Sequence, residues 1–296
     1  MPTSSGTIVV ALGGNAVAPA RERPTIGNQF RHTRESLAPI VDLARAGWNI
    51  ALVHGNGPQV GDDLARNELA AGQLEPLPLG VLVAGTAGWM GYMIQQSLQN
   101  ALRRAGVERT VVTLITQTLV DADDPRLREP TKPIGHGKWR RLAPSPRPIA
   151  IVERAMVQSL VREGHIVIAC GGGGPPVYQD HALGLEGIDA VADKDRVAAI
   201  LGHDIAAQVL LILTDVDAVY RGWGTPAQRA IRRLSLDEAD QLLQGEELGT
   251  GSMRPKVEAA ADFVRTGGER AIIAELARGP AALQGEAGTT IAKETG

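Results

Sequence analysis

Short aliphatic runs alternate along the chain with longer segments whose apolar residues recur at helical spacing. The short runs predict buried β-strands, because they hold consecutive apolar residues and several of them end in glycine. Strands are predicted over Thr7–Leu12, Asn49–Val53, Thr110–Ile115, His165–Cys170, Gln208–Leu213, Arg270–Ala274 and Thr289–Lys293. Helices are predicted over Phe30–Ala46, Val60–Ala71, Val81–Ala105, Ile149–Glu163, Asp193–Leu201, Ser235–Gln244 and Pro255–Thr266. This alternation predicts a mostly parallel sheet with helices on both faces.

Residues 121–148 interrupt this alternation. The segment holds six prolines, shows no hydrophobic period and contains the basic stretch Lys138-Trp139-Arg140-Arg141. A loop of this length inside a compact domain is usually functional or disordered. We therefore expect a protruding loop at this place.

Composition narrows the class of protein. Hydrophobic residues make up 44% of the 296-residue chain and aromatic residues only 3%, so the core must be aliphatic. A net charge of −3, with both signs dispersed, argues against nucleic acid or an anionic membrane as a partner. Because no apolar run reaches membrane-spanning length and the first residues lack a signal-peptide layout, we expect a soluble cytoplasmic protein. Cys170, the single cysteine, excludes an internal disulfide and is expected to be buried rather than nucleophilic.

Lysine is scarce and placed unusually. Only five of the 30 basic residues are lysines, and Lys132, Lys194 and Lys256 lie in segments that read as loops or helix starts. An ammonium group is a compact charge on a flexible stem, which a guanidinium does not replace where a single oxygen must be met. These lysines therefore suggest phosphate binding, although a general preference for arginine with leftover lysines is the alternative.

Three glycine clusters follow predicted strands: Gly13-Gly14-Asn15, Gly55-Asn56-Gly57 and Gly171–Gly174. In open parallel sheets, ligands bind beyond the carboxyl ends of the strands, so we expect these clusters to converge on one crevice. Bare peptide N–H groups there can bind an anion. The alternatives are tight structural turns and a dinucleotide-binding fingerprint, whose glycine spacing is not met. His54, which precedes the second cluster, is more consistent with a structural residue than with a base.

Carboxylates accompany the lysines. In Asp193-Lys194-Asp195, Asp193 is either the cap of a helix with Lys194 in solvent, or the two carboxylates hold the ammonium or approach a metal ion. Thr214 through Asp217, at the end of a strand, either contact a nucleotide or Mg²⁺ or only turn the chain. Lys256 falls in the first turn of a helix, where a cation is unfavourable unless an anion lies nearby.

Taken in order, these segments resemble the carbamate kinase branch of the amino-acid kinase family over nearly the whole chain. The motifs that carry the resemblance are Ala11-Leu12-Gly13-Gly14-Asn15-Ala16, His54–Gly61, Pro130–Gly135, Pro144-Ser145-Pro146, Gly171–Gly174, Asp193-Lys194-Asp195, Ile212–Asp217 and Gly251–Lys256.

The resemblance implies a three-layer αβα open sandwich that transfers a phosphoryl group reversibly between ATP and carbamate. Residues 1–190 would form a lobe that binds carbamate, with the short protruding loop 121–148, and residues 191–296 a nucleotide-binding lobe, together one compact unit. Mg²⁺, a homodimer, a cytoplasmic location and a role in arginine metabolism are also implied.

Particular residues are expected to serve this chemistry. Lys194 and Lys256 would neutralise the transferring phosphoryl group, and Lys132 would reach in from the protruding loop. Carbamate and the moving phosphate would bind at Gly13, Gly14, Asn15, Gly55, Asn56, Gly57, Gly172 and Gly173. The nucleotide would bind at Thr214, Asp215, Asp217 and Met253, and Asp195 would approach the metal.

Two features depart from the family pattern. The segment between Gly135 and Trp139 is shorter than the hairpin that carbamate kinases usually carry, and Arg254 is an unusual cation that either contacts phosphate or faces solvent. The short loop leaves two alternatives open: a phosphotransferase of this fold acting on another small carboxylate, and a non-catalytic nucleotide-binding regulator.

Overall fold

An eight-stranded sheet forms the centre of the molecule in the computed structural model, which describes residues 6–14, 22, 25–245, 247–248 and 252–293. The strands lie in the order β14 (Arg233–Ser235), β16 (Thr289–Ala292), β15 (Arg270–Glu275), β11 (Val209–Thr214), β1 (Thr7–Leu12), β2 (Asn49–His54), β8 (Ile166–Ile168) and β3 (Val111–Thr113). Every neighbouring pair is parallel except β15 with β16. The predicted mostly parallel sheet is confirmed.

Strand β1 shows why its sequence is a continuous apolar run. Val9 and Ala11 belong to one hydrophobic core, whereas Ile8, Val10 and Leu12 belong to a second core on the opposite face of the sheet. Successive side chains of a strand point to opposite faces, so a strand covered on both sides must be apolar at every position.

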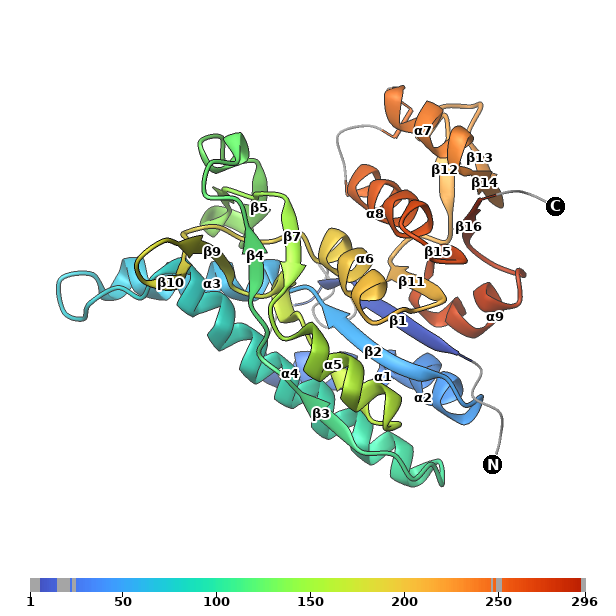
Figure 1. Cartoon of the computed structure of the whole chain (residues 1–296), viewed down its shortest axis with the longest axis horizontal. Coiled ribbons are helices and arrows are strands. Elements are labelled where there is room, and N and C mark those ends of the chain that lie inside the picture. The colour runs from blue at the N-terminus through green and yellow to red at the C-terminus, as the bar shows by residue number, and fades with distance from the viewer. Residues whose placement is uncertain (1–5, 15–21, 23–24, 246, 249–251, 294–296) are drawn as a thin grey trace.

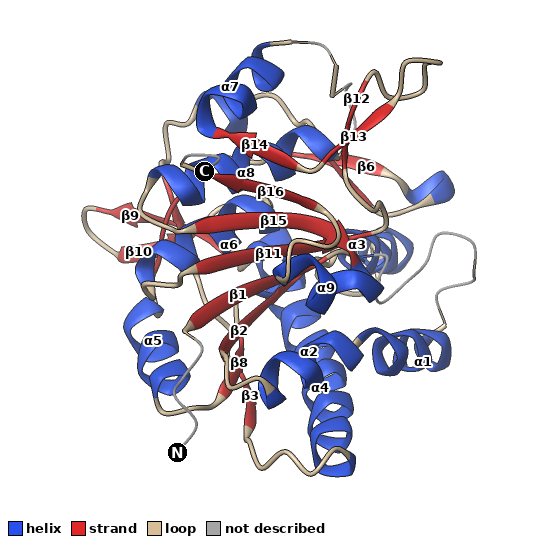
Figure 2. Ribbon diagram, turned by 90° about the vertical axis from the view of Figure 1, so that its right-hand side faces the viewer, coloured by secondary structure: helices blue, strands red, loops and turns tan. Residues whose placement is uncertain are grey.

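Helices cover both faces, as Figures 1 and 2 show. One core contains side chains from α5, α6, α7 and α8, and the other contains side chains from α2, α4 and α9. The predicted three-layer sandwich is therefore confirmed. The helices are α1 (Ile26–Ser36), α2 (Ala38–Arg45), α3 (Gly57–Ala70), α4 (Leu79–Arg104), α5 (Arg154–Arg162), α6 (Lys194–Asp204), α7 (Leu236–Gln244), α8 (Met253–Arg265) and α9 (Gly279–Leu283). Among the described residues, no helix combines the length and apolar character needed to cross a membrane.

Smaller sheets were not predicted. A four-stranded sheet holds β10 (Gly184–Gly187), β9 (Pro176–Asp180), β4 (Thr118–Val120) and β7 (Pro148–Ile151), and two hairpins pair β12 (Val219–Arg221) with β13 (Arg229–Ile231) and β5 (Lys132–Ile134) with β6 (Arg141–Ala143). These strands are three to five residues long and several begin or end with proline or glycine, so they lack the alternation that identifies a strand.

Two predicted helices are wrong in extent. The helix expected over Phe30–Ala46 is two helices, because Pro39 lies at the start of α2 and has no backbone N–H to continue α1. The helix expected over Ile149–Glu163 begins only at Arg154, since Pro148–Ile151 pair with β4 as strand β7.

The protruding loop is an ordered hairpin rather than an irregular segment. Strands β5 and β6 are joined by the short helix η3 (Gly137–Trp139), and the hairpin stands above the main sheet in Figure 1. It is fastened to α3: the N–H of Gly135 donates to the carbonyl of Gly57 at 2.8 Å. A Cβ on Gly61 would lie 2.0 Å from the Cα of Gly135, so only glycine permits this contact between two backbones.

The variant Gly61→Ala tests this attachment. We expect it to lower the free energy of unfolding by about 1–3 kcal/mol, because the backbones must separate. The matched control is Gly85→Ala, inside α4, where nothing lies within 4 Å of the added methyl group. Helix propensity should make the control neutral or stabilising by up to about 1 kcal/mol. Equal stability of the two variants in urea titrations would contradict the close contact.

Candidate active site

A cavity of about 500 Å³ lies beyond the carboxyl ends of β1, β11 and β15. Its lining residues are Gly13, Gly14, Pro58, Lys194, Leu213, Thr214, Asp215, Ser252, Lys256, Glu275, Leu276 and Ala277. The cavity lies at the edge of the sheet where the sequence predicted a crevice, beyond the carboxyl ends of parallel strands.

Three helices begin at this cavity. Pro58 lies in the first turn of α3, Lys194 is the first residue of α6, and Ser252 precedes α8. The first N–H groups of a helix have no partner within the helix, and the helix dipole adds partial positive charge at the same end. The cavity is suited to an anion because three such helix ends meet there beside the backbone of Gly13 and Gly14.

The carboxylate of Asp195 holds two lysines together. Its Oδ1 lies 2.5 Å from the Nζ of Lys194 and its Oδ2 lies 3.4 Å from the Nζ of Lys256. All three side chains are at least 88% buried, since their exposed fractions are 12%, 8% and 5% for Lys194, Lys256 and Asp195. Lys256 lies near the positive N-terminal end of α8, where a cation is unfavourable, and Asp195 supplies the anionic partner that offsets this.

Burial is the main influence on Lys256. Desolvation lowers the pKa of this lysine, and the charge of Lys194 lowers it further, whereas the pairing with Asp195 raises it. One carboxylate thus faces two ammonium groups, so these three side chains together carry one positive charge, while Asp215 and Glu275 bring two carboxylates to the cavity wall. An anionic ligand beside the two lysines would balance the charge of this cluster.

Lys132 connects the β5–β6 hairpin to α6. Its ammonium is ion-paired with Asp193, which also caps α6 by accepting from the N–H groups of Asp195 and Arg196 at 2.9 and 3.2 Å. Burial opposes ionisation of Asp193, but Lys132 and these hydrogen bonds hold its pKa below the usual range. Asp193 is therefore both the helix cap and an ion-pair partner. Lys132 and Asp193 line an adjoining cavity of about 810 Å³, which shares Ser252 with the first.

The expectation that all three glycine clusters converge on one crevice is wrong in part, because residues of the second and third clusters do not line this cavity. A Cβ on Gly55 would lie 3.1 Å from the side chain of Lys194, and a Cβ on Gly172 would lie 2.1 Å from the amide of Asn56. Asn56 is buried and donates to Thr86 Oγ1 at 2.7 Å. Gly55 therefore packs against Lys194, and Gly172 packs against Asn56.

Other predicted residues are distributed as follows. Gly57 packs near the carbonyl of Pro133, Gly173 packs against Ala192, Asp217 accepts from the Tyr220 hydroxyl at 2.8 Å, and Met253 packs against the core shared by α6 and α8. Thr214 and Asp215 line the cavity, and Asn15 lies outside the described residues.

Arg254 has neither of the two expected roles. Its guanidinium donates to the carbonyl of Leu243 and, at 2.6 Å, to that of Gly245, at the carboxyl end of α7. Cations stabilise the carboxyl ends of helices, so Arg254 ties the start of α8 to the end of α7.

His54 and Cys170 are buried beneath the site. Desolvation lowers the pKa of His54 to about 4, which keeps the ring neutral near pH 7 and agrees with a structural role. Desolvation also raises the pKa of Cys170 to about 12, so the thiol is unsuited to nucleophilic attack, as expected from the sequence.

Sequence reasoning missed Glu275, the last residue of β15, and the following Leu276 and Ala277, which line the cavity. The signal was available, because β15 was predicted and runs parallel to β11. Parallel strands end at the same edge, so the residues after each of them belong to the crevice.

A model of the amino acid kinase family matches residues 6–275. The chain belongs to the amino acid kinase family. Within this family, the chain is 39% identical to a carbamate kinase from Pyrococcus horikoshii, over 96% of this chain and 98% of the relative. It is 44% identical to a carbamate kinase from Halobacterium salinarum, over 96% and 97% of the two chains. The resemblance to the carbamate kinase branch of the family is thus confirmed.

Solved structures of the same kinase branch share the fold. The structure titled as carbamate kinase from Giardia lamblia bound to AMP-PNP has a TM-score of 0.93 and 35% sequence identity, over 99% of this chain and all of that chain.

The variant Asp195→Asn tests the shared carboxylate. It leaves two buried ammonium groups without a counter-ion, so we expect a loss of about 3 kcal/mol in unfolding free energy at pH 7. Because the pKa of Lys256 is already lowered and falls further without Asp195, this lysine gives up its proton as pH rises, and the loss should be smaller at pH 10 than at pH 7.

The control for this experiment is Asp262→Asn, at a surface ion pair with Arg265. Its effect should remain within about 0.5 kcal/mol at pH 7. Urea unfolding of both variants at the two pH values provides the measurement. An Asp195→Asn protein as stable as the control would show that the carboxylate does not hold the lysines.

Proposed function

We propose that the protein is an ATP-dependent kinase that transfers a phosphoryl group reversibly between ATP and carbamate, giving ADP and carbamoyl phosphate. The observation that carries the proposal is the pair of buried lysines held by Asp195 beside the backbone of Gly13 and Gly14. The family branch supports the acceptor, since the relatives named above are carbamate kinases.

The reaction needs positioning and charge neutralisation. An oxygen of carbamate attacks the γ-phosphorus of ATP while the bond between that phosphorus and the bridging oxygen to the β-phosphate breaks. The electron pair of that bond leaves with ADP. The carbamate oxygen is already anionic, so no general base is required. Lys194 and Lys256 neutralise the charge on the moving group, and Asp195 keeps both ammonium groups in place.

The remaining predicted residues divide between the two substrates. Thr214 and Asp215, with Asp217 and Met253, would serve the nucleotide in the lobe formed by residues 191–296. Gly13, Gly14, Gly55, Asn56 and Gly57 would serve carbamate and the phosphate, together with Gly173 and with Gly172, which lies against the amide of Asn56. Lys132 would reach the acceptor from the hairpin, exchanging Asp193 for a ligand oxygen.

Mg²⁺ is proposed as the ion that accompanies the nucleotide and shields its phosphates. Among the described residues, no group of three histidine, cysteine or acidic side chains forms a metal cage. This fits Mg²⁺, which usually binds through substrate phosphates, water and only one or two carboxylates. Both oxygens of Asp195 face lysines, so Asp215, in the cavity wall, is the better placed carboxylate.

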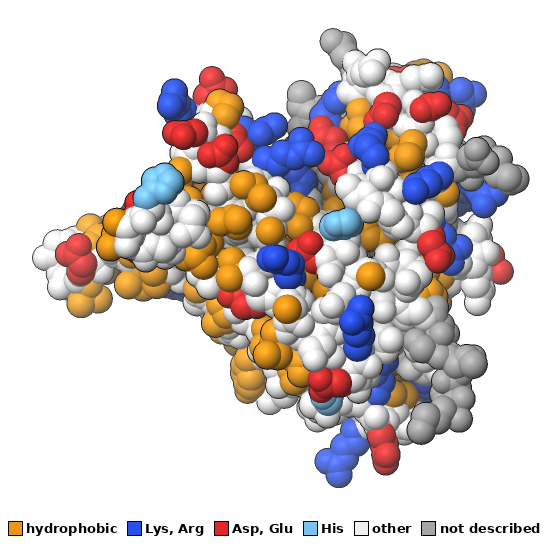
Figure 3. Space-filling model, in the orientation of Figure 1, with side chains coloured by type: hydrophobic (Ala, Val, Ile, Leu, Met, Phe, Trp, Pro, Cys, Tyr) orange, Lys and Arg blue, Asp and Glu red, His pale blue; other side chains and the backbone are white. Residues whose placement is uncertain are grey.

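A homodimer is also proposed. Ile149 on β7 and Met156 on α5 are 54% and 56% exposed, and Figure 3 shows hydrophobic side chains gathered over this face of the molecule. Exposed apolar patches often mark subunit interfaces.

Light scattering should give twice the mass of one chain, and Ile149→Lys should reduce the measured mass towards that of a single chain. A monomeric wild-type protein would contradict this arrangement.

Activity is tested most simply in the direction of ATP synthesis. Purified protein with ADP, Mg²⁺ and carbamoyl phosphate should form ATP, and Lys194→Ala or Lys256→Ala should each lower kcat by about a hundredfold to a thousandfold, as expected for loss of one charge contact. The control, Lys293→Ala, removes an exposed lysine and should leave kcat unchanged. Turnover that survives either cavity variant would remove that lysine from the mechanism.

The short connection between β5 and β6 favours one alternative acceptor class. A smaller lid covers less of the acceptor site, so another small carboxylate could replace carbamate. ADP release measured over a panel of small carboxylates separates the two activities. Nucleotide binding without turnover on any acceptor would instead indicate a regulator.

The family resemblance is also the basis for proposing a cytoplasmic location and a role in arginine metabolism. Fractionation of cells that express the chain tests the first proposal, and the second depends on the enzyme activity. Neither affects the chemistry of the site.

A further inference from the structure

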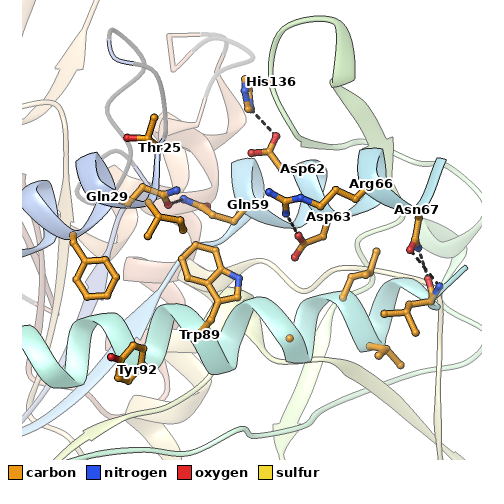
Figure 4. Close-up of a pocket in the computed structure, with 16 residues that line it drawn as sticks. Thr25, Gln29, Gln59, Asp62, Asp63, Arg66, Asn67, Trp89, Tyr92 and His136 are labelled. Atoms are coloured by element: carbon orange, nitrogen blue, oxygen red, sulfur yellow. Dashed lines mark hydrogen bonds and ion pairs between the residues drawn. The ribbon is translucent and has the colours of Figure 1, made fainter. Parts of the chain in front are cut away.

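A third cavity, of about 1020 Å³, lies between α1, α3, α4 and the β5–β6 hairpin (Figure 4). None of its lining residues belongs to the 500 Å³ cavity that contains the lysines. Its size is that of a small-molecule site, and the proposed phosphoryl transfer does not use it.

Aromatic side chains form one part of its wall. Phe30 and Tyr92 pack edge to face, with ring centroids 6.3 Å apart and planes at 74°. Trp89 also lines the cavity, on the same face of α4 as Tyr92 (Figure 4). Aromatic residues are only 3% of this chain, so three in one cavity provide an unusual concentration of ring faces. Such faces attract cations.

Hydrogen-bond acceptors form the opposite part. Gln59 is only 4% exposed; its Nε2 donates to Gln29 Oε1 at 2.9 Å, and its Oε1 has no partner among the described residues. Asp62 lies one turn further along α3, and His136 of the hairpin lies 3.3 Å from its carboxylate. This contact involves Oδ1 of Asp62, and the second oxygen of the carboxylate can accept from a ligand.

We propose that this cavity binds a small organic cation, an amidinium, guanidinium or ammonium group carried on a flat or apolar body. The cationic group would donate to Asp62 and to the amide of Gln59, and the body would lie against Trp89. A neutral ring would add no charge opposite Asp62, whose neighbour is His136 rather than an arginine or lysine. An anion would be repelled by Asp62, whereas Asp63 is ion-paired with Arg66.

The position of the cavity connects it to the rest of the molecule. Gln59 and Asp62 stand in the first two turns of α3, the helix whose Pro58 lines the cavity of the lysines. His136 belongs to the hairpin that carries Lys132. A bound cation would therefore touch both elements that frame the acceptor side of the proposed active site.

Calorimetry with the full chain tests the proposal through two probes of nearly the same shape. Benzamidine is a flat cation and benzamide is its neutral counterpart. We expect benzamidine to bind saturably at one site per chain and about tenfold more tightly than benzamide, the difference expected for a partly exposed ion pair with a cation–ring contact. This comparison uses the unaltered protein and needs no activity.

Variants then assign the site. Asp62→Asn and Trp89→Leu should each weaken benzamidine binding about tenfold. Their controls are Asp42→Asn, the same change on the outer surface of α2, and Trp223→Leu, an exposed tryptophan elsewhere, and both should bind as the unaltered protein does. Thermal melts show whether each variant is folded.

Three outcomes would overturn the proposal: no saturable heat with benzamidine, equal affinity for the two probes, or benzamidine binding unchanged in both Asp62→Asn and Trp89→Leu. None of them bears on phosphoryl transfer, because the lysines of the other cavity are intact in every variant.

Discussion

One carboxylate shared by two lysines is the interaction on which the proposed site depends. Lys194 and Lys256 are buried like charges, and each would be costly without an opposite charge nearby. Asp195 supplies only half of the charge they need. The excess positive charge of this cluster lies beside helix N-termini and glycine backbone, where a phosphoryl group would balance it, whereas Asp215 and Glu275 bring negative charge to another part of the same wall.

The fold brings these three residues together from distant places. Asp195 and Lys194 stand at the start of α6 and Lys256 at the start of α8, 61 positions beyond Asp195. Both helices lie on the same face of the sheet, and each leads into one of two parallel strands, α6 into β11 and α8 into β15. Their N-termini therefore meet at the carboxyl edge. The apolar strands β1, β11 and β15 fix that edge, because they pair in parallel and end at neighbouring positions.

The sequence was most informative where one physical requirement dominates. Strand β1 was predicted over its full extent and β11 within one residue, because burial on both faces demands an unbroken apolar run. The crevice followed from the strand ends and their glycines. The lysines were identified because an ammonium at a helix start needs an anion.

The same reasoning could not reach contacts made by tertiary packing. Strands β9 and β10 are short, β9 begins with proline and β10 begins and ends with glycine, and β9 joins its sheet by pairing with β4, more than 50 residues earlier. Arg254 binds carbonyl groups at the end of α7, and no local sequence pattern predicts that α7 ends beside it. That Asp195 would serve both lysines was likewise open, since a flanking carboxylate could have approached a metal instead.

A double-mutant cycle on kcat for ATP formation tests the central claim most directly. Lys194 and Lys256, both held by Asp195, are proposed to neutralise the same phosphoryl group. The double Lys194→Ala, Lys256→Ala variant should then lose little more activity than the worse single variant, because the effects of residues that act as a unit do not add. Losses that multiply, as they would for two independent surface charges, would contradict the account.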